Sequence, residues 1–490
     1  MIKVIGADRM AKSITRNYIY NLSYQVLTLI TPFITIPYLS RVLGPNGIGE
    51  YSFTFSVVTY FVLAANLGVS NYAQREIAYA QEDTYRQSRT FYEVSVLRFL
   101  LVLVNLVVYY FVVASWQVSH TIYWLQALNI VAVAFDISWF FQGLEEFGKI
   151  VFRNFLVRIL NVASIFLLIH QASDVLKYTA LMGGMNVLSG ILIWLYLPEH
   201  LVKVPIREWK PFRNFLIIWQ MFLPQIAIQI YVVLNKTMLG LFSASYAENG
   251  YYEQADKLVK LLLTLATSLG TVMLPRISYA YAQGLQAEVK RYMLRSFQFT
   301  WFLTIPMCLG LMAIAPNFVP WFYGPGYEKT GVILQIISGI LVAIGLSNVI
   351  GIQYLLPTNR QNELTLSVVI GAVFNFLINL VLIPRYQSIG VAISTLLTEC
   401  IVTGVQFYLV RKNFGFFEIV SISKKYWIAG AFMFFVIFLF ERSLQPSFLH
   451  TILVILIGSI LYFGILIFLH DTLIQQGWNK ISELKNKLVR

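Results

Sequence analysis

Hydrophobic stretches of about twenty residues recur along the whole 490-residue chain, and short charged segments separate them. A helix needs roughly 20 apolar residues to cross the ~30 Å hydrocarbon core of a bilayer. The pattern therefore predicts an all-α, polytopic membrane protein with about fourteen transmembrane helices. The predicted spans are 17–39, 47–68, 90–114, 121–144, 150–170, 175–197, 212–236, 247–274, 292–315, 330–356, 364–384, 387–410, 425–441 and 449–470.

Composition agrees with this prediction, and the charge distribution sets the orientation. Hydrophobic residues make up 58% and charged residues 12% of the chain, whereas soluble domains carry about 25% charged residues. With the N-terminus inside, 26 lysines and arginines lie in inner segments and five in outer segments. This asymmetry predicts a cytoplasmic-membrane protein with both termini cytoplasmic. It also explains the net charge of +13 without a nucleic-acid partner, and favours contact with anionic membrane lipid.

The segments after spans one and seven resemble each other, which indicates an internal repeat. Gly49 precedes Arg75 by 26 residues, and Gly250 precedes Arg276 by the same number. Six spans separate the copies, so both enter the membrane in the same sense. Parallel repeats are typical of transporters that bind substrate between two rocking bundles, and no channel filter sequence is evident. The predicted regions are a six-helix lobe at 1–200, a second at 201–415, and two further helices with a basic cytoplasmic tail at 416–490.

Polar side chains inside the spans indicate surfaces that avoid lipid. Span one carries a polar stripe at steps of three or four that includes Asn21 and Thr28. Span seven places Gln225 and Gln229 on one face. Two interpretations stay open for these residues: hydrogen bonds between helices, or the polar wall of a cavity.

Basic residues in or at the ends of spans are the strongest candidates for substrate binding. They are Arg98, Arg41, Arg158 and Lys236. Arg98 or Arg158 could extend to the membrane surface. Alternatively, these cations form the wall of a cavity for an anionic substrate, because guanidinium groups bind phosphate oxygens through paired hydrogen bonds.

Two isolated carboxylates, Asp136 in span four and Glu399 in span twelve, are candidates for ion coupling. A carboxylate at this depth should pair with a cation or take up a proton. If its charge is costly in only one conformation, binding of a proton or sodium ion biases the conformational exchange. The other interpretation is a fixed ion pair between Asp136 and Arg98 or Arg158.

The sequence offers no candidate for enzyme chemistry. It contains no recognisable nucleotide-binding loop, nucleophile triad or catalytic carboxylate pair. Both cysteines lie within predicted spans, and the five histidines stand singly, with no spacing that suits a metal site. We therefore expect a transporter without a metal or cofactor.

Several motifs resemble those of Wzx-type polysaccharide flippases. Residues 37–49, PYLSRVLGPNGIG, resemble the end of their span one, and residues 136–147, DISWFFQGLEEF, resemble their span-four signature. The start of their second lobe is similar to NKTMLG at 235–240, GYYEQA at 250–255 and MLPRIS at 273–278. Asn379 to Pro384, with Gly390 and Glu399, fits the later part. The resemblance covers roughly residues 10–415.

This family belongs to the multidrug/oligosaccharidyl-lipid/polysaccharide exporter superfamily. The resemblance implies a fourteen-helix, two-lobed protein that flips an undecaprenyl-pyrophosphate-linked oligosaccharide from the inner to the outer leaflet by alternating access. The exported product would be a capsular, exo- or surface polysaccharide, with glycosyltransferases and a polysaccharide polymerase as partners. The last two helices could form a groove for the lipid tail.

Other functions stay open at this point. A relative in the same superfamily could flip a peptidoglycan precursor or export cationic drugs, but a drug exporter predicts acidic cavities. A membrane polymerase or ligase of sugar chains would be an enzyme, and those commonly need a sizeable outer loop. No predicted outer loop here exceeds roughly fifteen residues. A structural membrane scaffold would leave the charges inside the spans unexplained.

Overall fold

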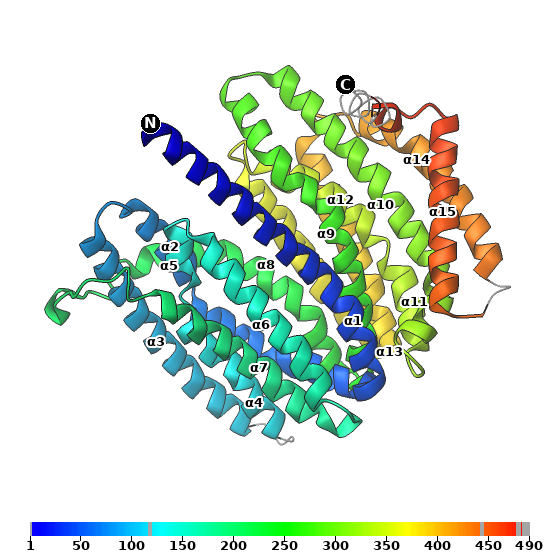
Figure 1. The fold of residues 1–490 in the computed structure, drawn as a ribbon. Coiled ribbons are helices and arrows are strands. Elements are labelled where there is room, and N and C mark those ends of the chain that lie inside the picture. The colour runs from blue at the N-terminus through cyan, green and yellow to red at the C-terminus, as the bar shows by residue number, and fades with distance from the viewer. Residues whose placement is uncertain (1, 116–119, 442–444, 477–481, 483–490) are drawn as a thin grey trace. The chain divides into compact units, whose positions relative to one another are not determined.

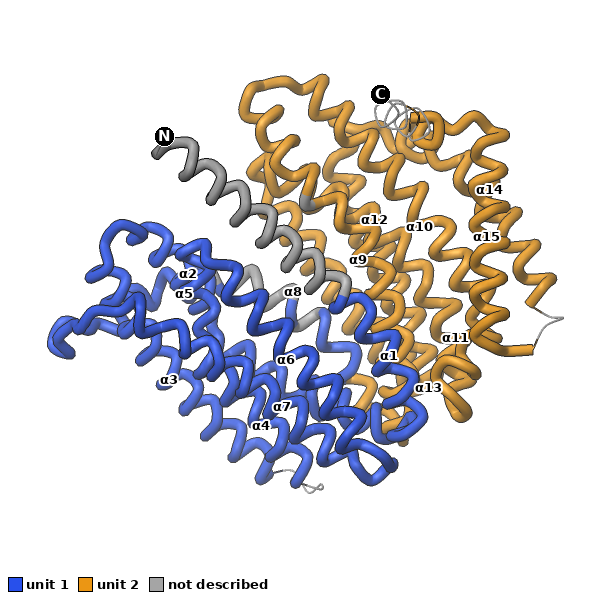
Figure 2. The backbone as a smooth tube through the Cα atoms, in the orientation of Figure 1, with its two compact units in different colours: residues 1–237 blue, residues 238–490 orange. Residues whose placement is uncertain are grey.

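The computed structural model describes residues 2–115, 120–441, 445–476 and 482, without the side chains of 2–26, 120, 221, 223–228, 230, 231 and 271. Every regular element in this part of the chain is a helix (Figure 1). The chain divides into two compact units, residues 1–237 and 238–490 (Figure 2). The division falls inside α8 (Phe215–Phe242), the first helix of the second predicted lobe.

The first unit begins with a helix that bends sharply. At Gly44 the backbone of α1 has φ 67° and ψ 176°, a conformation that glycine adopts without the penalty a Cβ would bring. The bend divides α1 into two spans. The elements of this unit are α1 (Ile2–Asn66), α2 (Val69–Tyr79), α3 (Thr84–Ser115), α4 (His120–Phe135), α5 (Ser138–Gly143), α6 (Phe147–Leu168), η1 (Ala172–Asp174), α7 (Val175–Leu192), η2 (Ile193–Tyr196), η3 (Ile206–Glu208) and most of α8.

Helix α4 lies at the centre of the first unit, where it packs against α1, α3 and α7. Its buried side chains Ile122, Ile130 and Ala134 belong to an apolar core. On the far side of α3, large apolar residues such as Leu103 and Phe111 are exposed. An apolar exposed face is expected where a helix meets lipid, so α4 is the interior helix and α3 borders the bilayer.

The second unit also contains a bent helix. Within α13, Gln387 has φ 53° and ψ −127°, three residues after Pro384. The bend is held by Glu248, whose Oε2 accepts hydrogen bonds from the backbone N–H and the hydroxyl of Ser388. The elements of this unit are α9 (Ala247–Ala282), α10 (Gln286–Phe322), α11 (Glu328–Ile337), α12 (Ile340–Ile350), a π-helical turn (Gly351–Leu355), α13 (Gln361–Val410), α14 (Phe416–Glu441) and α15 (Phe448–Phe468).

The described residues confirm the predicted all-α, polytopic fold. Eleven helical stretches are long and apolar enough to cross a membrane. Two of them, Leu27–Tyr79 and Gln361–Val410, contain the bends at Gly44 and Gln387 and so supply two spans each. Together with α8, the described part of the chain accounts for the fourteen predicted spans.

The two copies of the sequence repeat differ in local structure. In the first copy the helix ends before Gly68, which has φ 74° and starts α2; a Cβ there would approach the backbone of Ile218 and Phe222 at 3.2 Å. In the second copy α9 continues through Gly270, whose Cβ would meet Asn348 Oδ1 at 2.9 Å. Both glycines allow a close helix contact, but only Gly68 interrupts its helix. Superposition of the two lobes stays a prediction.

Candidate functional site

Span four is interrupted at Asp136, which the sequence analysis treated as the middle of a continuous helix. Helix α4 ends at Phe135 and α5 begins at Ser138. A helix end inside a membrane leaves carbonyl oxygens that must find donors within the protein. Trp194 Nε1 donates to the Phe135 carbonyl at 2.7 Å, and Arg98 Nη1 donates to the Asp136 carbonyl. Side chains from two other helical segments therefore donate hydrogen bonds to the carbonyl oxygens of Phe135 and Asp136 at the break.

Arg98 hydrogen-bonds to groups on several sides of this break. Its side chain is 2% exposed, and Nη2 donates to Asn66 Oδ1 at 2.8 Å and to Ser70 Oγ at 2.5 Å. The guanidinium group thus joins α3 to the end of α1, the start of α2 and the end of α4. Arg98 is directed to these groups and not to the membrane surface.

The carboxylate of Asp136 accepts hydrogen bonds from the first residue of α5. Its Oδ1 accepts hydrogen bonds from the Ser138 backbone N–H at 3.0 Å and from the Ser138 hydroxyl. Arg153 Nη1, on α6, lies 3.7 Å from the same oxygen and donates to Ser138 Oγ at 2.9 Å. The alternative interpretation paired Asp136 with Arg98 or Arg158, but the arginine near the carboxylate is Arg153. Arg98 contacts only the backbone of Asp136.

The Asp136 side chain is 50% exposed and faces a cavity of about 320 Å³ within the first unit. Helices α1, α4, α6 and α7 contribute its walls. Polar lining residues include Thr59, Asn129, Arg153, Asn186 and Ser189. Asn186 Nδ2 donates to Asn129 Oδ1, and Asn129 Nδ2 donates to Gln126 Oε1, both at 2.9 Å. This cavity has the polar groups that a hydrophilic ligand needs, and Arg98 is not among its lining residues.

Glycines allow the helices to approach the break. A Cβ on Gly190 of α7 would lie 2.9 Å from Phe135 Cβ, so only glycine fits against the end of α4. A Cβ on Gly143 would lie 2.7 Å from the Gln74 carbonyl of α2. Gly143 belongs to α5, beyond the break, and packs against α2.

The other predicted site residues have different surroundings. Arg158 Nη2 donates to the Thr28 carbonyl at 3.4 Å, which joins α6 to α1. Arg41 and Gln229 are exposed and Lys236 is partly buried. Glu399 is buried in α13 of the second unit. The side chains of Asn21 and Gln225 lie outside the described residues.

Sequence reasoning missed Arg153, which lies closest to the Asp136 carboxylate among the arginines discussed above. We had counted it as one of the inner-segment cations that determine orientation, because it follows the start of span five. The available signal was Asp136 itself, because an Asp side chain commonly accepts a hydrogen bond from the backbone N–H two residues further on and so favours a turn. Asn66, Ser70 and Trp194 carried no such signal, since only the fold brings them to the break.

Comparison with known proteins defines the class to which this fold and site belong. Residues 14–280 match the family model described as "Polysaccharide biosynthesis protein". A protein of Escherichia coli K12 named for O-antigen transport is 26% identical over 82% of this chain and 97% of its own length. A protein of Haloferax volcanii named as a flippase of low-salt glycan biosynthesis is 21% identical over 91% and 92% of the two chains.

A solved structure shows the same fold. The lipid II flippase MurJ in an inward closed conformation matches with a TM-score of 0.72 at 18% identity, over 94% of this chain and all of that one. The chain is thus a polytopic, all-helical membrane protein with the fold of that structure. It belongs to the polysaccharide biosynthesis protein family, because the family model covers more than half of its length.

Proposed function

We propose that this chain is a flippase that moves an undecaprenyl-pyrophosphate-linked oligosaccharide from the inner to the outer leaflet of the cytoplasmic membrane by alternating access. The family assignment and the relatives named for O-antigen transport and glycan flipping support this function. The product would be a capsular, exo- or surface polysaccharide. Glycosyltransferases would make the substrate and a polymerase would extend it after transfer.

The observation that carries this proposal is the charge at the break in span four. Arg153 lies 3.7 Å from the Asp136 carboxylate beside a polar cavity, and the buried Arg98 donates to the backbone carbonyl of the same residue. Charge inside a membrane protein is costly unless it is balanced. The excess positive charge favours an anionic ligand, and a pyrophosphate accepts the paired hydrogen bonds that arginine donates. Arg158, which is also on α6, and Arg41 and Lys236 would add positive potential.

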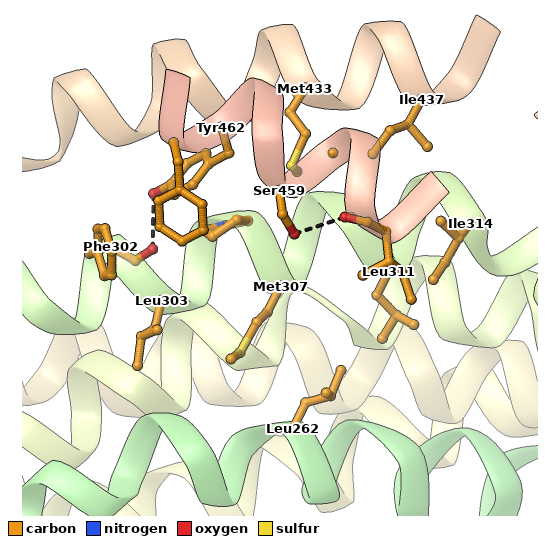
Figure 3. A pocket seen from close by; sticks show the side chains of 15 residues that line it. Leu262, Phe302, Leu303, Met307, Leu311, Ile314, Met433, Ile437, Ser459 and Tyr462 are labelled. Atoms are coloured by element: carbon orange, nitrogen blue, oxygen red, sulfur yellow. Dashed lines mark hydrogen bonds between the residues drawn. The ribbon is translucent and has the colours of Figure 1, made fainter. Parts of the chain in front are cut away.

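The lipid part of the substrate needs an apolar surface. In the second unit a cavity of about 320 Å³ lies between α9, α10, α14 and α15 (Figure 3). Helices α14 and α15 are the two extra helices for which we expected a lipid groove. We infer that the polyprenyl chain occupies this cavity during transfer.

Asp136 remains our first candidate for coupling to a proton or sodium gradient, and Glu399 the second. The Asp136 carboxylate is half exposed to the cavity and also close to Arg153. A substrate phosphate that binds Arg153 would compete with the Asp136 carboxylate for the guanidinium group. Substrate binding and ion binding would then be linked through one side chain.

Two related functions remain as alternatives. A peptidoglycan precursor also carries a pyrophosphate on a polyprenyl chain, and the likeness to MurJ shows the fold alone. Export of cationic drugs is disfavoured by the excess positive charge at the break. The named relatives favour a surface-glycan substrate over both.

Binding measurements with an Arg153→Gln variant test this proposal. Loss of one charged hydrogen bond to phosphate costs about 1.5–3 kcal/mol, so we expect affinity for a lipid-linked oligosaccharide to fall at least about tenfold. Lys149→Gln, which removes a cation one turn earlier on α6, is the control. Equal affinity of the Arg153 variant and the native chain, at matched thermal stability, would contradict the proposed role of the site.

A further inference from the structure

One face of α10, in the second unit, lines two cavities that follow each other along the helix. The first is lined by Ala287, Lys290, Arg291, Leu294, Arg295 and Gln298, together with Ile422 of α14. The second is the apolar cavity of Figure 3, which α10 lines from Phe302 to Ile314. The lining positions recur at steps of three and four, so they share one helical face. Gln298 and Phe302 are one turn apart, about 6 Å along the axis.

The first cavity, of about 390 Å³, is basic. Lys290 Nζ lies 3.0 Å from Glu418 Oε2, and Arg291 Nη2 lies 2.9 Å from Glu288 Oε1; all four side chains are between 39% and 54% exposed. Such exposed ion pairs contribute little and exchange readily for another anion. Arg295 makes no hydrogen bond or ion pair with any part of the chain that the structure describes. Its guanidinium is therefore available to a ligand.

The groups beside the basic cavity are already paired with one another. Gln298 Nε2 donates to the Tyr426 hydroxyl at 3.0 Å, and Tyr426 donates to Asp471 Oδ2 at 2.8 Å. Asp471 is buried. Lys425 Nζ donates to the carbonyl of Leu469 at 2.8 Å. These contacts use the polar groups of the segment after α15. The charged residues that line the cavity are then Lys290, Arg291 and Arg295 of α10.

The second cavity is suited to hydrocarbon. Figure 3 shows Met307, Leu311, Met433 and other apolar side chains around it. Its two hydroxyl groups are satisfied by the protein: Ser459 donates to the Ile455 carbonyl at 2.8 Å and Tyr462 to the Phe302 carbonyl at 2.9 Å. Since neither hydroxyl needs a ligand, an alkyl or isoprenyl chain can enter without leaving a polar group unpaired.

We propose that the two cavities form a docking site in which the lipid-linked substrate waits before transfer. The pyrophosphate binds Lys290 and Arg295, and the first part of the polyprenyl chain enters the apolar cavity. Positive charge next to one narrow apolar cavity matches a lipid with a strongly anionic group on a single chain. This inference rests on the proposed function, and on the predicted orientation that puts Lys290 and Arg295 at the cytoplasmic surface.

Separate variants can test the two halves of the docking site. Lys290→Gln with Arg295→Gln removes the charge. Gly310→Leu fills the apolar cavity, since a Cβ on Gly310 meets only Met433 Cε, at 3.7 Å. Lys412→Gln, an exposed cation outside both cavities, and Gly464→Leu, where a Cβ meets nothing within 4 Å, are matched controls. The probe is undecaprenyl pyrophosphate without sugar, bound to the full chain in nanodiscs of zwitterionic lipid.

We expect each test variant to weaken binding of this probe about tenfold, because charged hydrogen bonds or chain contacts are lost, and the controls to leave it unchanged. Phosphatidylglycerol is measured in parallel. If the test variants weaken binding of phosphatidylglycerol only, the site holds a bilayer lipid and the proposal is overturned. The proposal is also overturned if the test variants change the binding of neither ligand. Flipping of the complete lipid-linked oligosaccharide by the native chain is scored separately. If the native chain does not flip the oligosaccharide but the test variants still weaken probe binding, the proposed function is overturned and the docking site is not.

Discussion

Arg98 donates a hydrogen bond to the backbone carbonyl of Asp136, although the two residues are 38 positions apart in the sequence. This contact explains how a transmembrane span can be interrupted in its middle. The Asp136 carbonyl has a charged donor from a neighbouring helix, so this carbonyl is not left unpaired. The break in turn directs the Asp136 carboxylate toward α5, Arg153 and the polar cavity.

Replacing Arg98 should therefore lower stability as well as transport. In Arg98→Ala, the part-buried Asp136 carbonyl loses its donor, which costs about 1–3 kcal/mol for an unsatisfied group. Asn66 Oδ1 loses one donor but keeps the Ser70 hydroxyl at 2.9 Å. We expect a lower melting temperature of the purified protein in detergent. Arg98→Lys should recover only part of the loss, because an ammonium group cannot reproduce the forked donor geometry.

Arg89→Ala is the matched control for this change. Arg89 lies on the same helix and forms a partly exposed i,i+4 pair with Glu93, and pairs of this spacing contribute about 0.3–0.5 kcal/mol. An Arg98→Ala protein that melts at the native temperature and has lost only transport would show that Arg98 acts on the substrate and not on the break.

The close approach of α7 to the break predicts a selective effect of added volume. Gly190→Ala places a methyl group 2.9 Å from Phe135 Cβ, and overpacking of this kind costs about 1–3 kcal/mol. Gly184→Ala, on the same helix, meets nothing within 4 Å and should be neutral or slightly stabilising. Thermal unfolding of both variants measures the difference. Equal melting temperatures would mean that α7 does not pack against α4 as described.

In the second unit, Glu248 should be a strong determinant of stability. Lys329 Nζ lies 2.7 and 2.8 Å from its two carboxylate oxygens, and Ser388 donates to one of them. Breaking a buried ion pair typically costs about 3–5 kcal/mol, and this pair is only partly exposed. We expect Glu248→Gln to destabilise the protein markedly, and Arg86→Gln, which removes an exposed cation 3.8 Å from Glu76, to change little. A double-mutant cycle with Lys329→Met should show coupling between the two residues, and additive effects would refute it.

Ion coupling through Asp136 predicts a change in the response to gradients. In Asp136→Asn the side-chain oxygen can still accept the hydrogen bond from the Ser138 backbone N–H, so the start of α5 keeps this contact. The variant cannot bind a proton or offer a carboxylate to sodium. In vesicles with an imposed proton or sodium gradient, we expect its flipping rate to lose gradient dependence while some downhill flipping remains. A full gradient response in Asp136→Asn would remove this residue from the coupling mechanism.

The sequence predicted the fold well because membrane spans are encoded locally. The length and apolar character of each segment are enough to mark it as a span. The bend at Gly44 falls between two predicted spans, and the bend at Gln387 falls on the first residue of the predicted span 387–410. The interior of the first unit was harder to predict. Asp136 was identified because a lone carboxylate is unusual in a span, but its partner was not. Arg153 resembled an ordinary inner-segment cation, and the partners of Arg98 are neutral side chains and a backbone carbonyl.

The measurement that tests this account most directly is flipping by the purified native chain in proteoliposomes. A fluorescent undecaprenyl-pyrophosphate-linked oligosaccharide is placed in both leaflets, and a membrane-impermeant reductant bleaches the accessible leaflet. We predict that bleaching proceeds beyond one half only in vesicles that contain the protein, and that Arg153→Gln slows it. Bleaching that stops at one half in protein-containing vesicles, with correctly folded protein, would contradict the proposed function.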